Sequence, residues 1–176
     1  MKYLLLLSLS FLFVFSSCKK NKVIGPSTNI FATVNNTTIN FNNNITITLD
    51  TSNAAVYGSS IIIYGQTDTS ASKASISIGI TSFNPSGVVA TGTYNSYASF
   101  NSFGYCNVIY KAVLPNVQTK TTYLTDPRNF YQSTVVITSS SKTNIQGTFT
   151  GRLVSSLGDT TTRLITNGKF NVPIGN

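Results

Sequence analysis

The stretch Ser75-Ile76-Ser77-Ile78-Gly79-Ile80 decides the fold class, because isoleucine alternates with a small residue over six positions. Successive side chains of a β-strand point to opposite faces of the sheet, so this pattern predicts a strand with one buried face and one small, mostly Ser outer face. The same alternation, with Thr as the polar partner, runs through residues 45–50. Residues 61–64, Ile-Ile-Ile-Tyr, are apolar on both faces, which predicts a strand covered on both sides or a central one.

Other stretches rich in β-branched and aromatic residues extend this pattern along the chain. They predict strands at residues 31–34, 37–41, 60–65, 88–94, 105–113, 134–138, 145–154, 161–166 and 169–174. Turn-forming residues separate them, among them Asn35-Asn36, residues 84–87 and Asn167-Gly168. No segment has a helical period. We therefore expect an all-β protein, an antiparallel β-sandwich or a meander barrel of roughly ten strands.

The composition of the 176 residues narrows the chemistry that the chain can perform. It has 25 Thr, 23 Ser and 19 Asn, but only 4 acidic residues, no His and 2 Cys. Zinc favours Cys and His, and hard cations favour clustered carboxylates, so we expect no metal site and no cofactor. We also expect no enzyme, since the remaining candidates for acid–base catalysis, besides Lys and Tyr, are Cys106, Asp50, Asp68, Asp126 and Asp159.

The N-terminus has the features of an export signal. Lys2 precedes an apolar run over residues 4–15, and Ser16-Ser17-Cys18 follows it. A helix over that run would span about 18 Å, which is shorter than a hydrocarbon core of about 30 Å. The ending resembles a bacterial lipobox, in which the cysteine receives a diacylglycerol and becomes the new N-terminus. An ordinary secretory signal with an incidental cysteine is the alternative.

This interpretation divides the chain into three parts. We expect a lipoprotein signal peptide at residues 1–17, a flexible tether at residues 18–29 and a single β-domain at residues 30–176. Acyl chains on Cys18 would bind the membrane almost permanently. Lys19, Lys20 and Lys22 would either rest on anionic headgroups or keep the tether hydrated. We do not expect nucleic acid as a partner, because the remaining basic residues are scattered and the signal directs export.

Several short motifs resemble those of an uncharacterised family of small lipoproteins from Bacteroidota. The matching segments are residues 31–36, Thr91-Gly92-Thr93-Tyr94, residues 145–150 and the closing stretch Ile165 to Ile174, which contains Ile-Thr-Asn-Gly and ends in Val-Pro-Ile. Asn36 stands where the family has the glycine of its first hairpin, and Gln146 where it has serine. The resemblance implies an envelope lipoprotein of unknown activity. Surface display in that phylum usually requires acidic residues after the lipidated cysteine. Residues 19–22, Lys-Lys-Asn-Lys, include none, so the resemblance favours the periplasmic face of the outer membrane.

Aromatic residues recur at nearly every third position between residues 94 and 105. Rings spaced by Asn and Ser suit a sugar or peptide surface, because flat apolar faces lie beside amides and hydroxyls. The alternative is that these rings fold back over a sheet edge or a barrel mouth and belong to the core. The candidate ligand-binding residues are Tyr94, Tyr97, Phe100, Phe103 and Tyr105.

Two further residues have a candidate role. Cys106 alternates with Val108 and Tyr110 in a predicted strand, the usual setting of a buried, inert thiol. Asp159-Thr160-Thr161 matches a short acceptor pattern that resembles Bacteroidota O-glycosylation sites, with Thr160 as the modified residue; a plain Asp/Thr turn is the alternative.

Together these features predict a lipid-anchored envelope protein of the outer membrane, with a structural or binding role and no catalysis. Its partners would be the membrane, through the acyl chains, and a glycan, an apolar ligand or an envelope protein. The alternative function is a lipocalin-like carrier that holds a small apolar ligand or a glycan near residues 94–105. A carrier would enclose a cavity of several hundred Å3, whereas a structural domain would have a filled core.

Overall fold

The computed structural model describes residues 28–50, 58–68, 73–83, 89–96, 104–113, 120–126 and 132–174. These residues form eleven strands and no helix, so the prediction of an all-β fold is confirmed. Among them, no helix is long and apolar enough to cross a membrane. The strands are β1 (Asn29–Val34), β2 (Thr37–Asn40), β3 (Asn43–Asp50), β4 (Ser59–Gln66), β5 (Ser75–Ser82), β6 (Gly92–Asn95), β7 (Gly104–Val113), β8 (Lys120–Leu124), β9 (Ser133–Ser140), β10 (Asn144–Ser155) and β11 (Thr162–Pro173).

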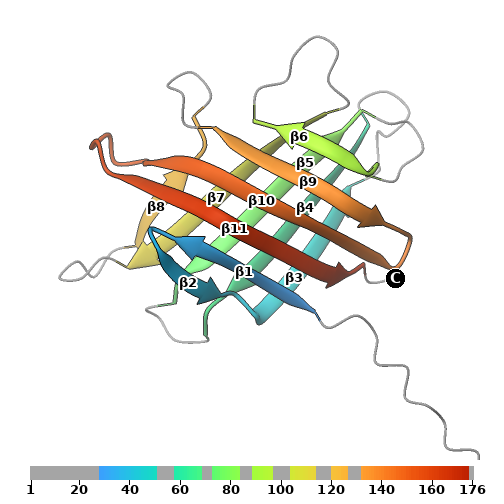
Figure 1. The fold of residues 1–176 in the computed structure, drawn as a ribbon, viewed down its shortest axis with the longest axis horizontal. Helices are drawn as coiled ribbons and strands as arrows, with labels where there is room; N and C mark the ends of the chain where they lie inside the picture. The colour runs from blue at the N-terminus through green and yellow to red at the C-terminus, as the bar shows by residue number, and fades with distance from the viewer. Residues whose placement is uncertain are drawn as a thin grey trace, which may run out of the picture.

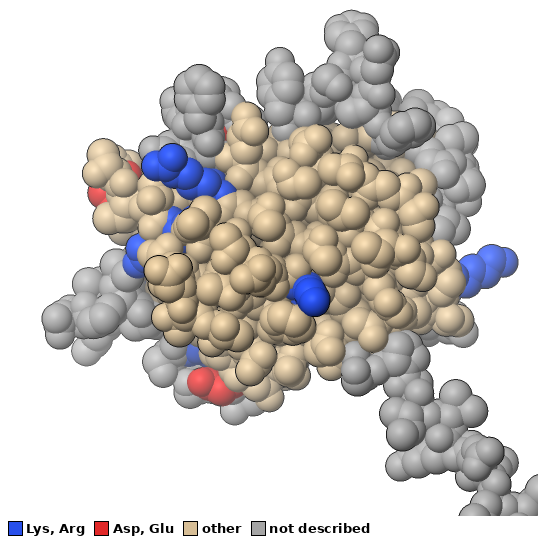
Figure 2. Space-filling model, in the orientation of Figure 1, with Lys and Arg blue, Asp and Glu red and all other residues tan. Residues whose placement is uncertain are grey.

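All the strands belong to one antiparallel sheet that curls into a half-barrel. The main order is β2-β1-β11-β10-β8-β7-β5-β4-β3, and β9 pairs with both β10 and β6. Figure 1 shows the result as two layers whose strands cross, with β1, β11, β10 and β9 in front of β3, β4, β5 and β7. Figure 2 shows that the front layer exposes few charged side chains.

The link between β2 and β3 explains the curl. These strands lie at opposite ends of the sheet order, but only Phe41 and Asn42 separate them in the chain. The Phe41 amide donates to the Ile30 carbonyl (2.8 Å), and the Asn42 Oδ1 accepts from the Ile30 amide (2.8 Å). The two ends of the sheet are therefore held close together, and the sheet must bend around the space between them.

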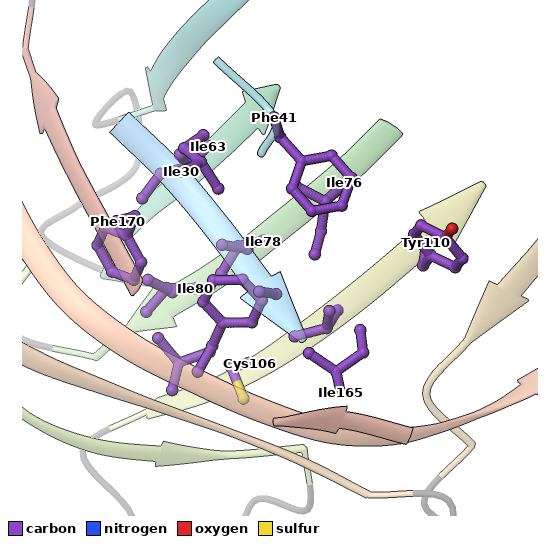
Figure 3. Close-up of a cluster of buried hydrophobic side chains, with 14 of the residues drawn as sticks. Ile30, Phe41, Ile63, Ile76, Ile78, Ile80, Cys106, Tyr110, Ile165 and Phe170 are labelled. Carbon is purple, nitrogen blue, oxygen red and sulfur yellow. The ribbon is translucent and has the colours of Figure 1, made fainter. Parts of the chain in front are cut away.

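That space is filled by the inner faces of both layers. Ile76, Ile78 and Ile80 are each 1 % exposed or less, as their alternation predicts. Figure 3 shows side chains of β1 and β11 directed toward those of β4, β5 and β7. The labelled members of this core are Ile30, Phe41, Ile63, Ile76, Ile78, Ile80, Cys106, Tyr110, Ile165 and Phe170.

The structure corrects the prediction of a turn at Asn167-Gly168. Residues 161–166 and 169–174 were expected to form two strands, but β11 runs without interruption from Thr162 to Pro173. Asn167 adopts a left-handed conformation (φ 51°), and the register of β11 shifts against both β10 and β1 at this level. Asn tolerates this conformation and an extra residue bends a strand, so the pair forms a β-bulge inside a long strand.

Two other strand predictions also differ from the structure. In residues 88–94, the strand begins only at Gly92. Strand β8, Lys120–Leu124, was not expected at all. Its inward-facing residues are Thr121 and Tyr123, which are 2 % and 0 % exposed. The strand sequence Lys-Thr-Thr-Tyr-Leu has a buried threonine at one of its inward positions and so shows no apolar alternation, which is why the sequence does not predict this strand.

Candidate functional site

A shallow groove of about 250 Å3 lies on the outer face of β4, β5 and β7. The pairing of these strands arranges its residues in three rows across the sheet. The rows are Ser60–Thr81–Tyr105, Ile62–Gly79–Asn107 and Tyr64–Ser77–Ile109, and all of these residues except Tyr64 line the groove. Because the inner face of the same strands carries the isoleucines of the core, the groove rests on a rigid support.

Gly79 forms the floor of the groove. A Cβ atom at this position would collide with the amide oxygen of Asn107, the neighbouring residue in the row. The missing side chain therefore lets the Asn107 amide lie over the sheet and creates the depression. An asparagine amide both donates and accepts hydrogen bonds, so it can donate to a ligand hydroxyl group or accept from one.

Apolar groups form the walls beside this amide. Ile62 is 47 % exposed and Tyr105 is 42 % exposed, and the Tyr105 ring lies 6.1 Å from that of Phe83, centroid to centroid, at an interplanar angle of 55°. None of the residues that line the groove carries a charge. The site therefore offers flat apolar surfaces, an amide and hydroxyl groups, which suits a neutral, polyhydroxylated ligand.

The structure separates the two described members of the aromatic series. Tyr94 is 1 % exposed and donates its hydroxyl to the Ala90 carbonyl (2.7 Å), so it belongs to the core. Tyr105 is exposed in the groove. Tyr97, Phe100 and Phe103 lie outside the described residues.

Of the nine residues that line the groove, the sequence identified only Tyr105 as a candidate. Nothing in the sequence marks Asn107 as part of a surface site. Ile62 could have been recognised, because residues 61–64 are apolar on both faces. The run predicts a strand that is covered on both sides or central, and β4 does lie between β3 and β5. Apolar side chains on the outer face of this strand are what could have indicated a surface site. Phe83, directly after β5, is exposed and packs its ring beside that of Tyr105, next to the groove.

Cys106 lies where the sheet divides. Strand β10 pairs with β9 at Ile145–Gly151 and then with β8 at Val154 and Ser155. In the gap between β9 and β7, the Cys106 Sγ lies 3.1 Å from the Tyr94 carbonyl oxygen and 3.6 Å from that of Ser133. Burial raises the pKa of this thiol to about 11, so it stays protonated at neutral pH and is a poor nucleophile. This agrees with the expected buried, inert cysteine.

The four aspartates lie in different segments. Asp50 ends β3, Asp68 follows β4, Asp126 follows β8, and Asp159 is in the β10–β11 turn. Within the described ranges, no three residues of the Cys, Asp, Glu and His types come together in a way that could hold a metal ion.

Thr160 is exposed in the β10–β11 turn, next to Asp159. The Asp159 carboxylate accepts hydrogen bonds from the Thr161 hydroxyl (2.5 Å) and amide (2.9 Å), which lowers the pKa of Asp159. This is an ordinary Asx-type turn, and it leaves Thr160 accessible. Cys18, the expected lipidation site, lies outside the described residues.

The chain was compared with protein-family models, curated proteins and solved structures, and none of them matches it.

Proposed function

We propose that this protein is a lipid-anchored, non-catalytic envelope protein whose β-domain binds a neutral glycan. The observation that supports the binding role is the groove over Gly79, where the Asn107 amide lies over the sheet and the exposed side chains of Ile62 and Tyr105 line the same depression. A sugar has hydroxyl groups for the amide and an apolar face for the ring. The absence of charge along the groove lining favours a neutral sugar over an acidic one.

An outer-face site fits this domain better than internal carriage of a large ligand. The inner faces are occupied by tightly packed isoleucine and aromatic side chains, among them Ile63, Phe41 and Tyr123, which are 0 % exposed. The groove also needs no opening of the sheet, because its rows are set by the pairing of β4, β5 and β7.

Glycan binding is tested with the full chain on an array of neutral and acidic oligosaccharides, followed by titration calorimetry with any ligand found. Tyr105→Ala and Asn107→Ala should each weaken binding at least several-fold without unfolding the domain, because both side chains are exposed. Leu164→Ala is the matched control, since Leu164 is an exposed apolar residue (51 %) on β11. Binding that survives both groove substitutions would refute the proposal.

The membrane anchor is a separate part of the proposal and has its own test. Cys18→Ala should abolish incorporation of labelled palmitate and release the protein from the outer-membrane fraction. We place the protein on the periplasmic face, so protease added to intact cells should leave it uncut. Digestion of the wild-type protein on intact cells would instead place it on the cell surface. The resemblance to Bacteroidota lipoproteins supports the anchor.

Glycosylation at Thr160 is a further part of the proposal. Intact mass spectrometry of the natively produced protein should show a glycan mass that Thr160→Ala removes. An identical mass for the unmodified polypeptide in both proteins would show that the segment is only a turn.

A further inference from the structure

A second cavity, of about 180 Å3, opens between the two layers of the sheet. One wall comes from β3 and β4 through Leu49 and Ile61. The opposite wall comes from the β9–β10 hairpin and the C-terminal end of β11, through Ile145 and Ile174. We call it the seam cleft. It is distinct from the groove, which lies on the outer face and shares no lining residue with it.

The seam cleft is apolar at its base and open at its rim. Ile61, Val89 and Ile145 are at most 2 % exposed, whereas Leu49 is 40 % exposed. A cavity of about 150 Å3 lined by aliphatic and aromatic side chains is large enough to bind benzene. The seam cleft therefore accommodates an apolar body of about that size or a short alkyl chain.

The β9–β10 turn places polar groups at one side of this apolar space. The Ser141 Oγ accepts hydrogen bonds from the amides of Thr143 (3.2 Å) and Asn144 (3.0 Å), and the Ile174 amide donates to the Thr143 carbonyl (2.9 Å). These bonds fix the turn against the end of β11. Lys142, an exposed residue of this turn, lines the cleft and brings a positive charge to it.

Ser140 adds a second polar group to the cleft lining. Its hydroxyl oxygen is shielded from solvent and has no hydrogen-bond partner among the described residues. Buried hydroxyl groups nearly always have a partner, so an unpaired one in a cleft lining is available to a ligand once rotation about the Ser140 Cα–Cβ bond turns it from its shielded position toward the cleft. A hydroxyl donor and an ammonium at one side of an apolar cleft are complementary to a carboxylate.

From these observations we infer that the seam cleft binds a small amphiphilic monocarboxylate. Its short alkyl or single-ring body would lie among Leu49, Ile61 and Ile145, and its carboxylate would accept hydrogen bonds from Ser140 and Lys142. This inference does not depend on glycan binding at the groove.

The test uses the full chain with Cys18→Ser, which removes the proposed acylation site, and hexanoate as the probe, with 1-hexanol as its neutral counterpart. Methyl NMR signals of Leu49, Ile61 and Ile145 should shift on titration with hexanoate and saturate. Lys142→Gln should weaken hexanoate binding several-fold and leave hexanol binding unchanged. Lys169→Gln, at another exposed lysine, is the control and should change neither.

Ser140→Ala separates a binding role from a structural one. Because the Ser140 hydroxyl has no partner among the described residues, its removal should not lower the urea midpoint of unfolding, but it should weaken hexanoate binding. The inference is overturned if the three methyl signals do not respond to hexanoate. It is also overturned if hexanoate and hexanol bind equally and Lys142→Gln changes neither, because the cleft would then have no preference for a carboxylate.

Discussion

Gly147 of β10 lies directly opposite Phe170 of β11, and the ring of Phe170 occupies the space that a side chain at position 147 would need. A Cβ atom at Gly147 would lie 2.5 Å from the Phe170 Cζ and 2.3 Å from the Val136 carbonyl oxygen of β9. Two positions along, the arrangement is reversed, because Phe149 lies opposite Gly168 and a Cβ there would lie 2.7 Å from the Phe149 ring. The two rings, 6.4 Å apart, thus pack over each other's glycine and join the two longest strands.

Substitution of Gly147 tests this packing. Gly147→Ala should lower the free energy of unfolding by about 1–3 kcal/mol, because the added methyl collides with the Val136 carbonyl oxygen and the Phe170 ring. Without a collision, alanine in a strand would be slightly more stabilising than glycine, so a loss of stability would indicate that the added methyl collides with its neighbours. Urea unfolding at neutral pH measures it, with Thr148→Ala as the neighbouring control. A variant as stable as the wild type would mean that both the Phe170 ring and the β9 backbone at Val136 can move aside without cost.

The bulge at Asn167 leads to a second prediction. A left-handed backbone costs a residue with a Cβ about 1–2 kcal/mol, and β-branched residues suffer most. Asn167→Val should therefore be destabilising by about that amount, whereas Asn167→Gly should remain close to the wild type. Thermal unfolding of the pair checks this. Equal stability of the Val and Gly variants would contradict the left-handed conformation at this residue.

Cys106 predicts a dependence of stability on pH. Burial raises its pKa to about 11 from the ordinary value of 9.0, so the folded state retains the thiol proton more strongly than the unfolded state. The resulting stabilisation is complete below pH 9 and is lost as the pH rises toward 11. It amounts to at most about 3 kcal/mol. Urea midpoints measured across this range should fall more steeply for the wild type than for Cys106→Ala.

A labelling experiment provides an independent check on the same thiol. At neutral pH the native protein should react with iodoacetamide much more slowly than the unfolded protein, because the thiol is buried and protonated. Native and unfolded rates that agree would show that Cys106 is accessible.

Substitution of Gly79, which forms the floor of the groove, should change ligand binding without changing folding. Gly79→Ala would displace the Asn107 amide, which is the end of an exposed, flexible side chain. We expect a stability change of less than about 1 kcal/mol, together with a clear loss of affinity for the glycan. Affinity that is unchanged while Asn107→Ala abolishes binding would mean that the ligand does not depend on the position of the amide.

The sequence could predict which side chains of the described strands face the core, but not which strands pair or in what register. Ile76, Ile78 and Ile80 could be assigned to the core because alternation is a local property. The turn at Asn167-Gly168 was mispredicted because the same two residues suit a hairpin and a bulge, and only pairing with β1 and β10 distinguishes the two. The sequence also suggests that Tyr94 and Tyr105 belong to one ligand-binding surface. In the structure, Tyr94 is buried and Tyr105 is exposed.

What the sequence by itself determined is the β class and the inner face of most strands, because a two-residue period assigns each side chain to one face of a sheet. What only the tertiary structure decided is which outer faces lie side by side. Ile62, Gly79 and Asn107 are far apart in the chain and form one row only through the register of β4, β5 and β7. Leu49 and Ile145 likewise line one cleft only because the sheet curls. Register and curvature arise from contacts between distant segments, and a local pattern of residues does not encode them.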